Sequence, residues 1–124
     1  MKDTVLNPIK SSKTEVKFEL QDEKQVIVHC SMACMPGFCV RIWKTTYLIT
    51  EDGGKIPLVF WEGISLFPEW TNLYHTGMFH FTLIFSGLPT DCEVFTMAEE
   101  INEPGGFAVK NIVRNKKDVY KIQL

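Results

Sequence analysis

The stretch Met78–Phe85, MFHFTLIF, decides the fold class, because its side chains alternate between an apolar face and a mixed face. The apolar face consists of Phe79, Phe81, Leu83 and Phe85. A repeat of two is the spacing of a β-strand, in which successive side chains point to opposite sides. The stretch therefore predicts a central strand that buries its aromatic face.

The same alternation recurs on both sides of this stretch, in short segments separated by turn residues. The predicted strands are residues 15–20, 25–31, 38–50, 55–61, 78–85, 92–99, 107–113 and 119–124. Helical periodicity is absent, and a single helical turn is expected at Pro68-Glu69-Trp70. About seven to nine short strands predict an all-β fold, an antiparallel immunoglobulin-like β-sandwich, with an open or closed small barrel as the alternative.

Turn residues and a proline predict how some of these strands pair. Asp52-Gly53-Gly54 supplies the positive φ values of a tight hairpin turn. Pro57 has no N–H to donate to a neighbour, so Lys55–Trp61 is expected at a sheet edge or at a position where the N–H side of Pro57 faces water. The last two segments, Phe107–Val113 and Val119–Leu124, are expected to pair with each other as a hairpin.

Length and composition describe one ordinary globular domain. The chain has 124 residues, 45% of them hydrophobic, which is enough to bury a core without disulfides. We expect residues 1–14 to form a flexible arm or an edge strand, and residues 15–124 to form a single β-sandwich domain. The formal net charge of −2 is too balanced to attract nucleic acid.

The apolar residues are too scattered for a membrane span or a secretory leader. A span needs roughly 18 consecutive apolar residues, and a secretory leader needs an apolar run of roughly 7–15. We therefore expect a cytoplasmic protein as the sequence stands, or an exported one if a signal peptide was removed.

Three cysteines, Cys30, Cys34 and Cys39, lie close together in the sequence, and His29 or Cys92 is available to complete a zinc site. Their spacing lacks the two closely spaced pairs that structural zinc sites use. We favour buried thiols that pack as small apolar side chains over a metal site or a disulfide. A small metal- or thiol-dependent enzyme built on this cluster is the alternative hypothesis.

The other titratable clusters favour structural roles. No nucleotide-binding, metalloprotease, hydrolase or EF-hand motif occurs in the sequence. His75 and His80 have no acidic neighbour at a useful spacing, while the acidic run Glu99, Glu100 and Glu103 and the basic run Arg114–Lys117 are typical of solvated turns. We therefore expect a non-catalytic protein with no cofactor and no metal.

Large aromatic residues gather in and around the irregular segment 62–77. The set is Trp43, Tyr47, Trp61, Phe67, Trp70 and Tyr74. We favour burial for the set as a whole, because a two-layer core needs side chains of this size. An exposed subset would bind a protein or a glycan. The binding hypothesis names Trp61, Phe67, Trp70 and Tyr74. It keeps the Lys55–Trp61 edge as a second surface, for a partner's strand or a homodimer.

A series of short motifs between Gly37 and Asn111 resembles a known family. The motifs are Cys39-Val40-Arg41-Ile42 with Thr46-Tyr47, Gly53-Gly54, Glu62-Gly63-Ile64-Ser65-Leu66, Phe81-Thr82-Leu83-Ile84-Phe85, Leu88-Pro89, and Glu99 leading to Gly106-Phe107. They are similar to a family of uncharacterised bacterial β-sandwich domains, found alone or ahead of thioredoxin-like domains. The resemblance implies an immunoglobulin-like fold and a non-enzymatic accessory or binding role. It supplies no catalytic residue.

Overall fold

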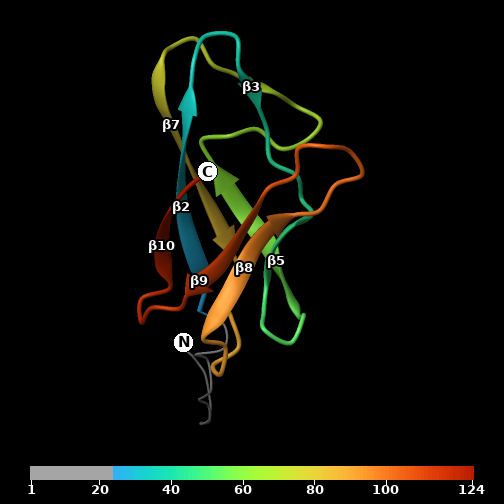
Figure 1. Cartoon of the computed structure of the whole chain (residues 1–124), viewed down its shortest axis with the longest axis vertical. Coiled ribbons are helices and arrows are strands. Elements are labelled where there is room, and N and C mark those ends of the chain that lie inside the picture. The colour runs from blue at the N-terminus through green and yellow to red at the C-terminus, as the bar shows by residue number, and fades with distance from the viewer. Residues whose placement is uncertain (1–23) are drawn as a thin grey trace, which may run out of the picture.

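The computed structural model describes residues 24–124, which form strands and loops without any helix (Figure 1). The strands are β2 (Val26–Cys34), β3 (Cys39–Val40), β4 (Thr46–Ile49), β5 (Lys55–Glu62), β6 (Thr71–Asn72), β7 (Gly77–Phe85), β8 (Val94–Glu99), β9 (Ala108–Val113) and β10 (Val119–Gln123). The arm expected at 1–14 and the strand expected at 15–20 lie outside the described residues.

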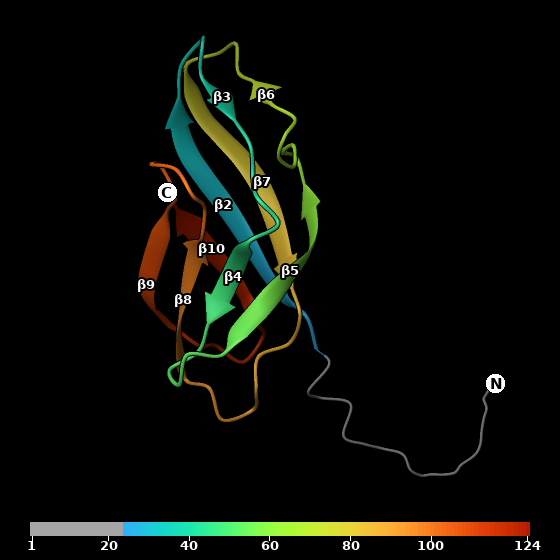
Figure 2. The same cartoon turned by 90° about the vertical axis from the view of Figure 1, so that its right-hand side faces the viewer.

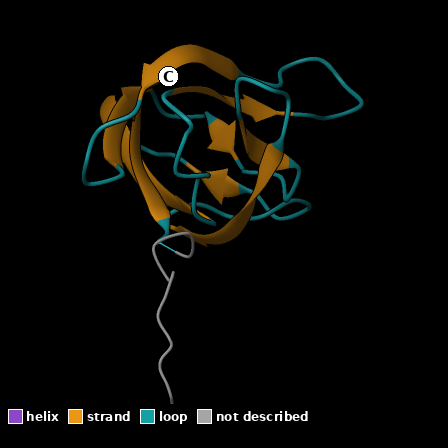
Figure 3. Cartoon of the chain, turned by 90° about the horizontal axis from the view of Figure 1, so that it is seen from below, coloured by secondary structure: helices purple, strands orange, loops and turns teal. Residues whose placement is uncertain are grey.

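Seven strands form one continuous sheet in the order β10-β2-β7-β5-β4-β8-β9. All neighbours are antiparallel except β10 and β2, which are parallel. The sheet curls strongly, and Figure 3 shows its strands wrapped around an enclosed interior. Phe95 of β8 and Tyr120 of β10 meet across that interior, with ring centroids 5.2 Å apart. The molecule is a half-barrel.

The all-β prediction is confirmed, but the immunoglobulin-like antiparallel sandwich is not, because one mixed sheet curls on itself instead of two sheets facing each other. The predicted hairpin of the last two segments is wrong. β9 and β10 follow each other in the chain but lie at opposite edges of the sheet, joined by residues 114–118. Alternation shows which side of a strand is buried, and it does not show which strand lies beside it.

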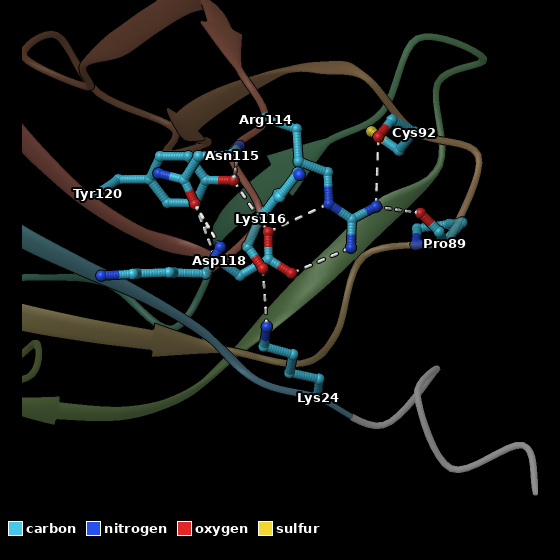
Figure 4. Close-up of polar contacts among 9 residues, drawn as sticks. Lys24, Pro89, Cys92, Arg114, Asn115, Lys116, Asp118 and Tyr120 are labelled. Atoms are coloured by element: carbon cyan, nitrogen blue, oxygen red, sulfur yellow. Dashed lines mark hydrogen bonds and ion pairs between the residues drawn. The ribbon is translucent and has the colours of Figure 1, made fainter.

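A polar cluster fixes the connection between the two edges (Figure 4). Arg114 donates to Asp118 from Nε at 3.1 Å and from Nη2 at 3.0 Å, and Tyr120 donates its hydroxyl to the same carboxylate at 2.9 Å. Arg114 also donates to the carbonyl oxygens of Pro89 and Cys92. The prediction that Arg114 lies in a solvated hairpin tip is therefore wrong.

The edge position predicted for Lys55–Trp61 is also wrong, since β5 lies in the middle of the sheet. The Pro57 carbonyl accepts the Ser86 N–H at 3.1 Å. In an antiparallel ladder the N–H and C=O of one residue point to the same neighbour. The missing N–H of Pro57 thus points beyond Leu58 and Phe85, the last pair of the β5–β7 ladder. The proline therefore removes only the reciprocal hydrogen bond to Ser86, at the end of this ladder.

The core lies on the concave face of the sheet. It includes Val26, Val28, Cys30, Leu48, Leu58, Phe81, Leu83, Phe85, Phe95 and Met97, all of them buried. β7 pairs with β2 on one side and β5 on the other, which confirms the central strand predicted from Met78–Phe85.

The small sheet of β3 and β6 lies beside the upper ends of β2 and β7 (Figure 2). The segment between β3 and β4 pairs with the 62–70 loop: Ile42 donates its N–H to Ser65 at 2.8 Å, and Phe67 donates its N–H to Ile42 at 2.7 Å. Leu66–Glu69 forms a turn instead of the predicted helical turn. Among residues 24–124 there is no helix that would be long and apolar enough to cross a membrane.

Candidate ligand-binding site

A pocket of about 340 Å³ opens between the β3–β4 segment, the residues before β6 and the loop after β8. Its polar residues include Arg41, Glu99 and Glu103. Its apolar wall includes Met32, Ile42, Trp43, Ile64, Trp70, Phe81 and Phe107. We call it the Arg41 pocket. Volumes of roughly 300–1,000 Å³ with apolar walls and a few polar groups are typical of small-ligand sites.

Arg41 is held against three aromatic rings. Its guanidinium carbon lies 3.8 Å from the ring centroid of Trp70, 4.6 Å from that of Phe67 and 5.5 Å from that of Trp43. Trp43 and Phe67 stack on each other with centroids 3.8 Å apart. The ring faces attract the cation and restrict its rotation, so the guanidinium is fixed in place.

The hydrogen-bonding capacity of Arg41 is largely unused. Its side chain is 14% exposed, and its closest carboxylate oxygen, on Glu103, lies 3.9 Å away. A guanidinium carries five N–H donors. Within residues 24–124, Arg41 makes one side-chain hydrogen bond, from Nη1 to the Pro68 carbonyl at 3.2 Å. Buried donors are usually paired, so the remaining N–H groups suit a bound partner.

Glu99 provides an acceptor in the same pocket. Glu99 is the last residue of β8, where its backbone N–H donates to the Phe107 carbonyl at 2.8 Å. Its Oε2 accepts the backbone N–H of Trp43 at 3.2 Å. Burial raises the pKa of Glu99 above its usual value, although the Trp43 N–H and the Arg41 charge act in the opposite direction. The prediction that Glu99 is part of a solvated turn is wrong, whereas Glu100 and Glu103 are exposed as expected.

The structure brings together two of the four predicted ligand-binding residues. Phe67 and Trp70 both contact Arg41. Trp61 lies on β5, half-buried against the core, and Tyr74 is 79% exposed and does not line the Arg41 pocket. The sequence analysis missed Arg41, Trp43 and Glu99 as site residues. In the sequence, Cys39, Arg41 and Trp43 alternate with apolar residues. This alternation was the feature that could have identified Arg41 and Trp43 as site residues.

The cysteines do not form the alternative cluster. Cys30 and Cys34 are buried on β2, while exposed Cys39 donates its thiol to Asn72 Oδ1 at 3.1 Å. In the described part of the chain, no three His, Cys, Asp or Glu side chains are placed to hold a metal ion. Burial raises the pKa of the Cys30 thiol to about 12, which keeps it protonated.

One cysteine contact was not foreseen. Cys34 Sγ lies 3.6 Å from Nε2 of His75, and it donates to the His75 carbonyl at 3.5 Å. These residues are far apart in the sequence, but Cys34 pairs with Gly77 at the start of β7, which brings His75 beside it.

No protein-family model matches the chain, and neither a curated protein nor a solved structure matches it.

Proposed function

We propose that the protein is a non-catalytic binding module whose ligand enters the Arg41 pocket. The observation that carries the proposal is the mostly buried guanidinium of Arg41, which lines the pocket and, as far as residues 24–124 are concerned, has most of its donors unpaired. A fixed cation with spare donors recognises oxygen atoms of a ligand at little entropic cost. The natural ligand belongs to a protein or to a glycan.

The arrangement of the polar groups favours binding over chemistry. Arg41 is stacked on aromatic rings, and Glu99 already accepts the N–H of Trp43. Both groups are held in place by the fold, as residues that orient a ligand must be. The role implied by the family resemblance, an accessory or binding domain, agrees with this proposal.

The test is a fragment titration followed by NMR. The probes are small amides, polyols, carboxylates and amines, added singly to the ¹⁵N-labelled chain. We expect a subset to shift the indole N–H signals of Trp43 and Trp70 and to leave that of Trp61 in place. Arg41→Met, which retains the apolar stem, should abolish these shifts. Lys121→Met on β10 is the matched control and should preserve them. If no fragment shifts Trp43 or Trp70, the proposal is wrong.

A sheet edge is the second candidate surface. Within residues 24–124, β9 and β10 each pair with a single neighbour, so each offers backbone groups to a partner's strand or to a second copy of the chain. Sedimentation over a wide concentration range tests self-association. A sedimentation coefficient that stays at the value of the monomer at every concentration would rule out the homodimer.

A further inference from the structure

We propose that the ligand of the Arg41 pocket is a neutral saccharide, with adjacent hydroxyl groups bridging the Arg41 guanidinium and the Glu99 carboxyl group. This inference rests on the proposed function and specifies the chemical class of the ligand. Three properties of the pocket support it: the pairing of donors and acceptors, the balance of charge, and the exposed indole face.

The first property is that the pocket offers hydrogen-bond donors on the Arg41 side and acceptors on the Glu99 side. A guanidinium has donors only, and an ionised carboxylate has acceptors only. Arg41 and Glu99 line the same pocket, and Glu99 uses Oε2 for the Trp43 N–H. A ligand that satisfies both sides must accept from one and donate to the other. A hydroxyl group does both, and sugar rings carry hydroxyls on adjacent carbons.

The second property is the balance of charge. Arg41 shares the pocket with Glu99 and Glu103. A carboxylate or phosphate ligand would be attracted by Arg41 but repelled by two acidic side chains, and an ammonium ligand would be attracted by the carboxylates but repelled by the Arg41 guanidinium, which the aromatic rings hold in place. A neutral polar ligand avoids both penalties. The surroundings of Arg41 thus argue against the anions that a lone arginine recognises.

The third property is an aromatic surface that stays accessible beside the polar groups. Trp70 is 52% exposed and lines the pocket. Arg41 covers one face of the indole, and the part of this rigid ring that stays exposed provides contact area for the C–H side of a pyranose at low entropic cost. The pocket volume, about 340 Å³, lies near the lower end of the range for ligand sites and suits one or two sugar rings.

An extended peptide fits this pocket less well. Peptides that bind β-proteins usually add a strand to a free edge. The pocket is bordered by the end of β8, which pairs with both β4 and β9, by the two-residue strand β3 and by loops. Among the described residues β3 pairs with β6 alone, but a strand of two residues offers few main-chain hydrogen bonds to a peptide.

The experiment uses the full chain and neutral oligosaccharides of two to four units, built from glucose, galactose, mannose, xylose or N-acetylglucosamine. Galacturonic acid oligomers and glucosamine oligomers are the charged comparisons. We expect at least one neutral oligomer to shift the Trp43 and Trp70 indole signals and to bind more tightly than either charged series. Arg41→Met and Trp70→Ala should each weaken this binding about tenfold, since each removes one of the contacts argued above. Lys121→Met should leave the affinity unchanged.

A ligand analogue protects the test against variants that fail to fold. With the unchanged protein, replacing one bridging hydroxyl of the oligomer that binds by hydrogen should weaken binding about tenfold. If all single deoxy analogues bind as well as the parent, the bridge is refuted.

The outcomes also separate this inference from the proposed function. If fragments shift Trp43 and Trp70 but no neutral oligomer does, the saccharide is wrong and the binding site stands. If a charged series binds more tightly than the neutral ones, the inference that the ligand is a neutral saccharide is wrong. If neither fragments nor oligomers shift these signals, both proposals fail.

Discussion

Asp118 is a buried carboxylate whose charge is compensated on two sides. Its side chain is 3% exposed, and it accepts hydrogen bonds from Arg114 and Tyr120. Burial by itself raises the pKa of Asp118, but the hydrogen bonds and the charge of Arg114 outweigh it, so the pKa is lower than the usual 3.8. The ionised form therefore stabilises the folded state. This stability is present above pH ~4 and is lost as the pH falls through the lowered pKa.

Replacing this carboxylate by an amide tests the compensation. We expect Asp118→Asn to lower the free energy of unfolding at pH 7 by about 3 kcal/mol, because Arg114 loses its buried partner. The difference from the unchanged protein should shrink as the pH falls below ~4, where Asp118 of the unfolded chain becomes protonated, and should be smallest below the lowered pKa of the folded protein. Urea unfolding between pH 2.5 and 7 measures both effects, with exposed Asp91→Asn as the control. A difference that is constant with pH would contradict the assignment.

The thiols differ in environment, and this predicts the order in which they react. Cys39 is exposed, whereas Cys30 is 2% exposed and has a pKa of about 12. Since the thiolate is the reactive form, iodoacetamide at pH 8 should alkylate Cys39 first. Cys30 should react only when the protein unfolds, so mild urea should accelerate its modification far more than that of Cys39. Peptide mass spectrometry of timed samples measures the rates, and equal rates would refute the prediction.

At the scale of elements, the end of β8 positions the candidate site. The backbone N–H of Glu99 donates to the Phe107 carbonyl. The backbone N–H of Glu100 donates to the Thr45 carbonyl at 2.9 Å. The β4 and β9 sides thus fix the backbone from which the Glu99 side chain enters the pocket. Gly106 contributes to this arrangement, since a Cβ at this position would lie 2.6 Å from the Glu99 carbonyl oxygen.

This close approach predicts the effect of a single methyl group. Gly106→Ala should force the loop away from the end of β8 and lower the free energy of unfolding by about 1–3 kcal/mol. It should also displace Glu99 and weaken ligand binding in the Arg41 pocket. Thermal unfolding measures the first effect. Asn102→Ala, an exposed change in the same loop, is the control and should be nearly neutral. If the two variants are equally stable, the backbone contact is not limiting.

At the scale of the whole molecule, the half-barrel has a continuous centre and two open edges. β7 is paired with β2 along its whole length and with β5 from Thr82 to Phe85, whereas within residues 24–124 β9 and β10 have one neighbour each. Backbone hydrogen bonds near an edge open by local fraying, while those at the centre require wider unfolding. The centre and the edges of the sheet are therefore expected to differ in local stability.

Hydrogen exchange should report this gradient directly. We expect the amides of β7 from Thr82 to Phe85, where β7 has a partner on both sides, to exchange most slowly, close to the rate set by global unfolding, and those of β9 to exchange much faster. In β9 the edge is also interrupted at Asn111, whose φ is 60°. NMR-detected exchange at neutral pH measures the rates residue by residue. Slow exchange throughout β9 that becomes faster on dilution would instead indicate that this edge is covered by a second copy.

The sequence predicted local features better than long-range ones. The β7 strand and the turn at Asp52-Gly53-Gly54 follow from alternation and turn chemistry, which are local. Nothing local in the sequence predicts the parallel pairing of β10 with β2, because the alternation of β10 is equally compatible with pairing to β9. Glu99 was misjudged for a related reason: its burial depends on Trp43 and Phe107, which are distant in the sequence.

The site was predicted only in part. The segment containing Phe67 and Trp70 was identified because aromatic side chains concentrate there. Arg41 was not, since nothing in its own neighbourhood shows that the 62–70 loop folds over it. Its role emerges from contacts that only the tertiary structure supplies.

The pairing of β10 with β2 has a consequence for how the protein is made. β2 is the first described strand and β10 the last, so this outer partner of β2 is missing until β10 has been synthesised. During synthesis, that side of β2 must be kept from joining other chains. The more slowly the chain from β2 to β10 is translated, the longer it is expected to need a chaperone, until Val119–Gln123 emerge from the exit tunnel.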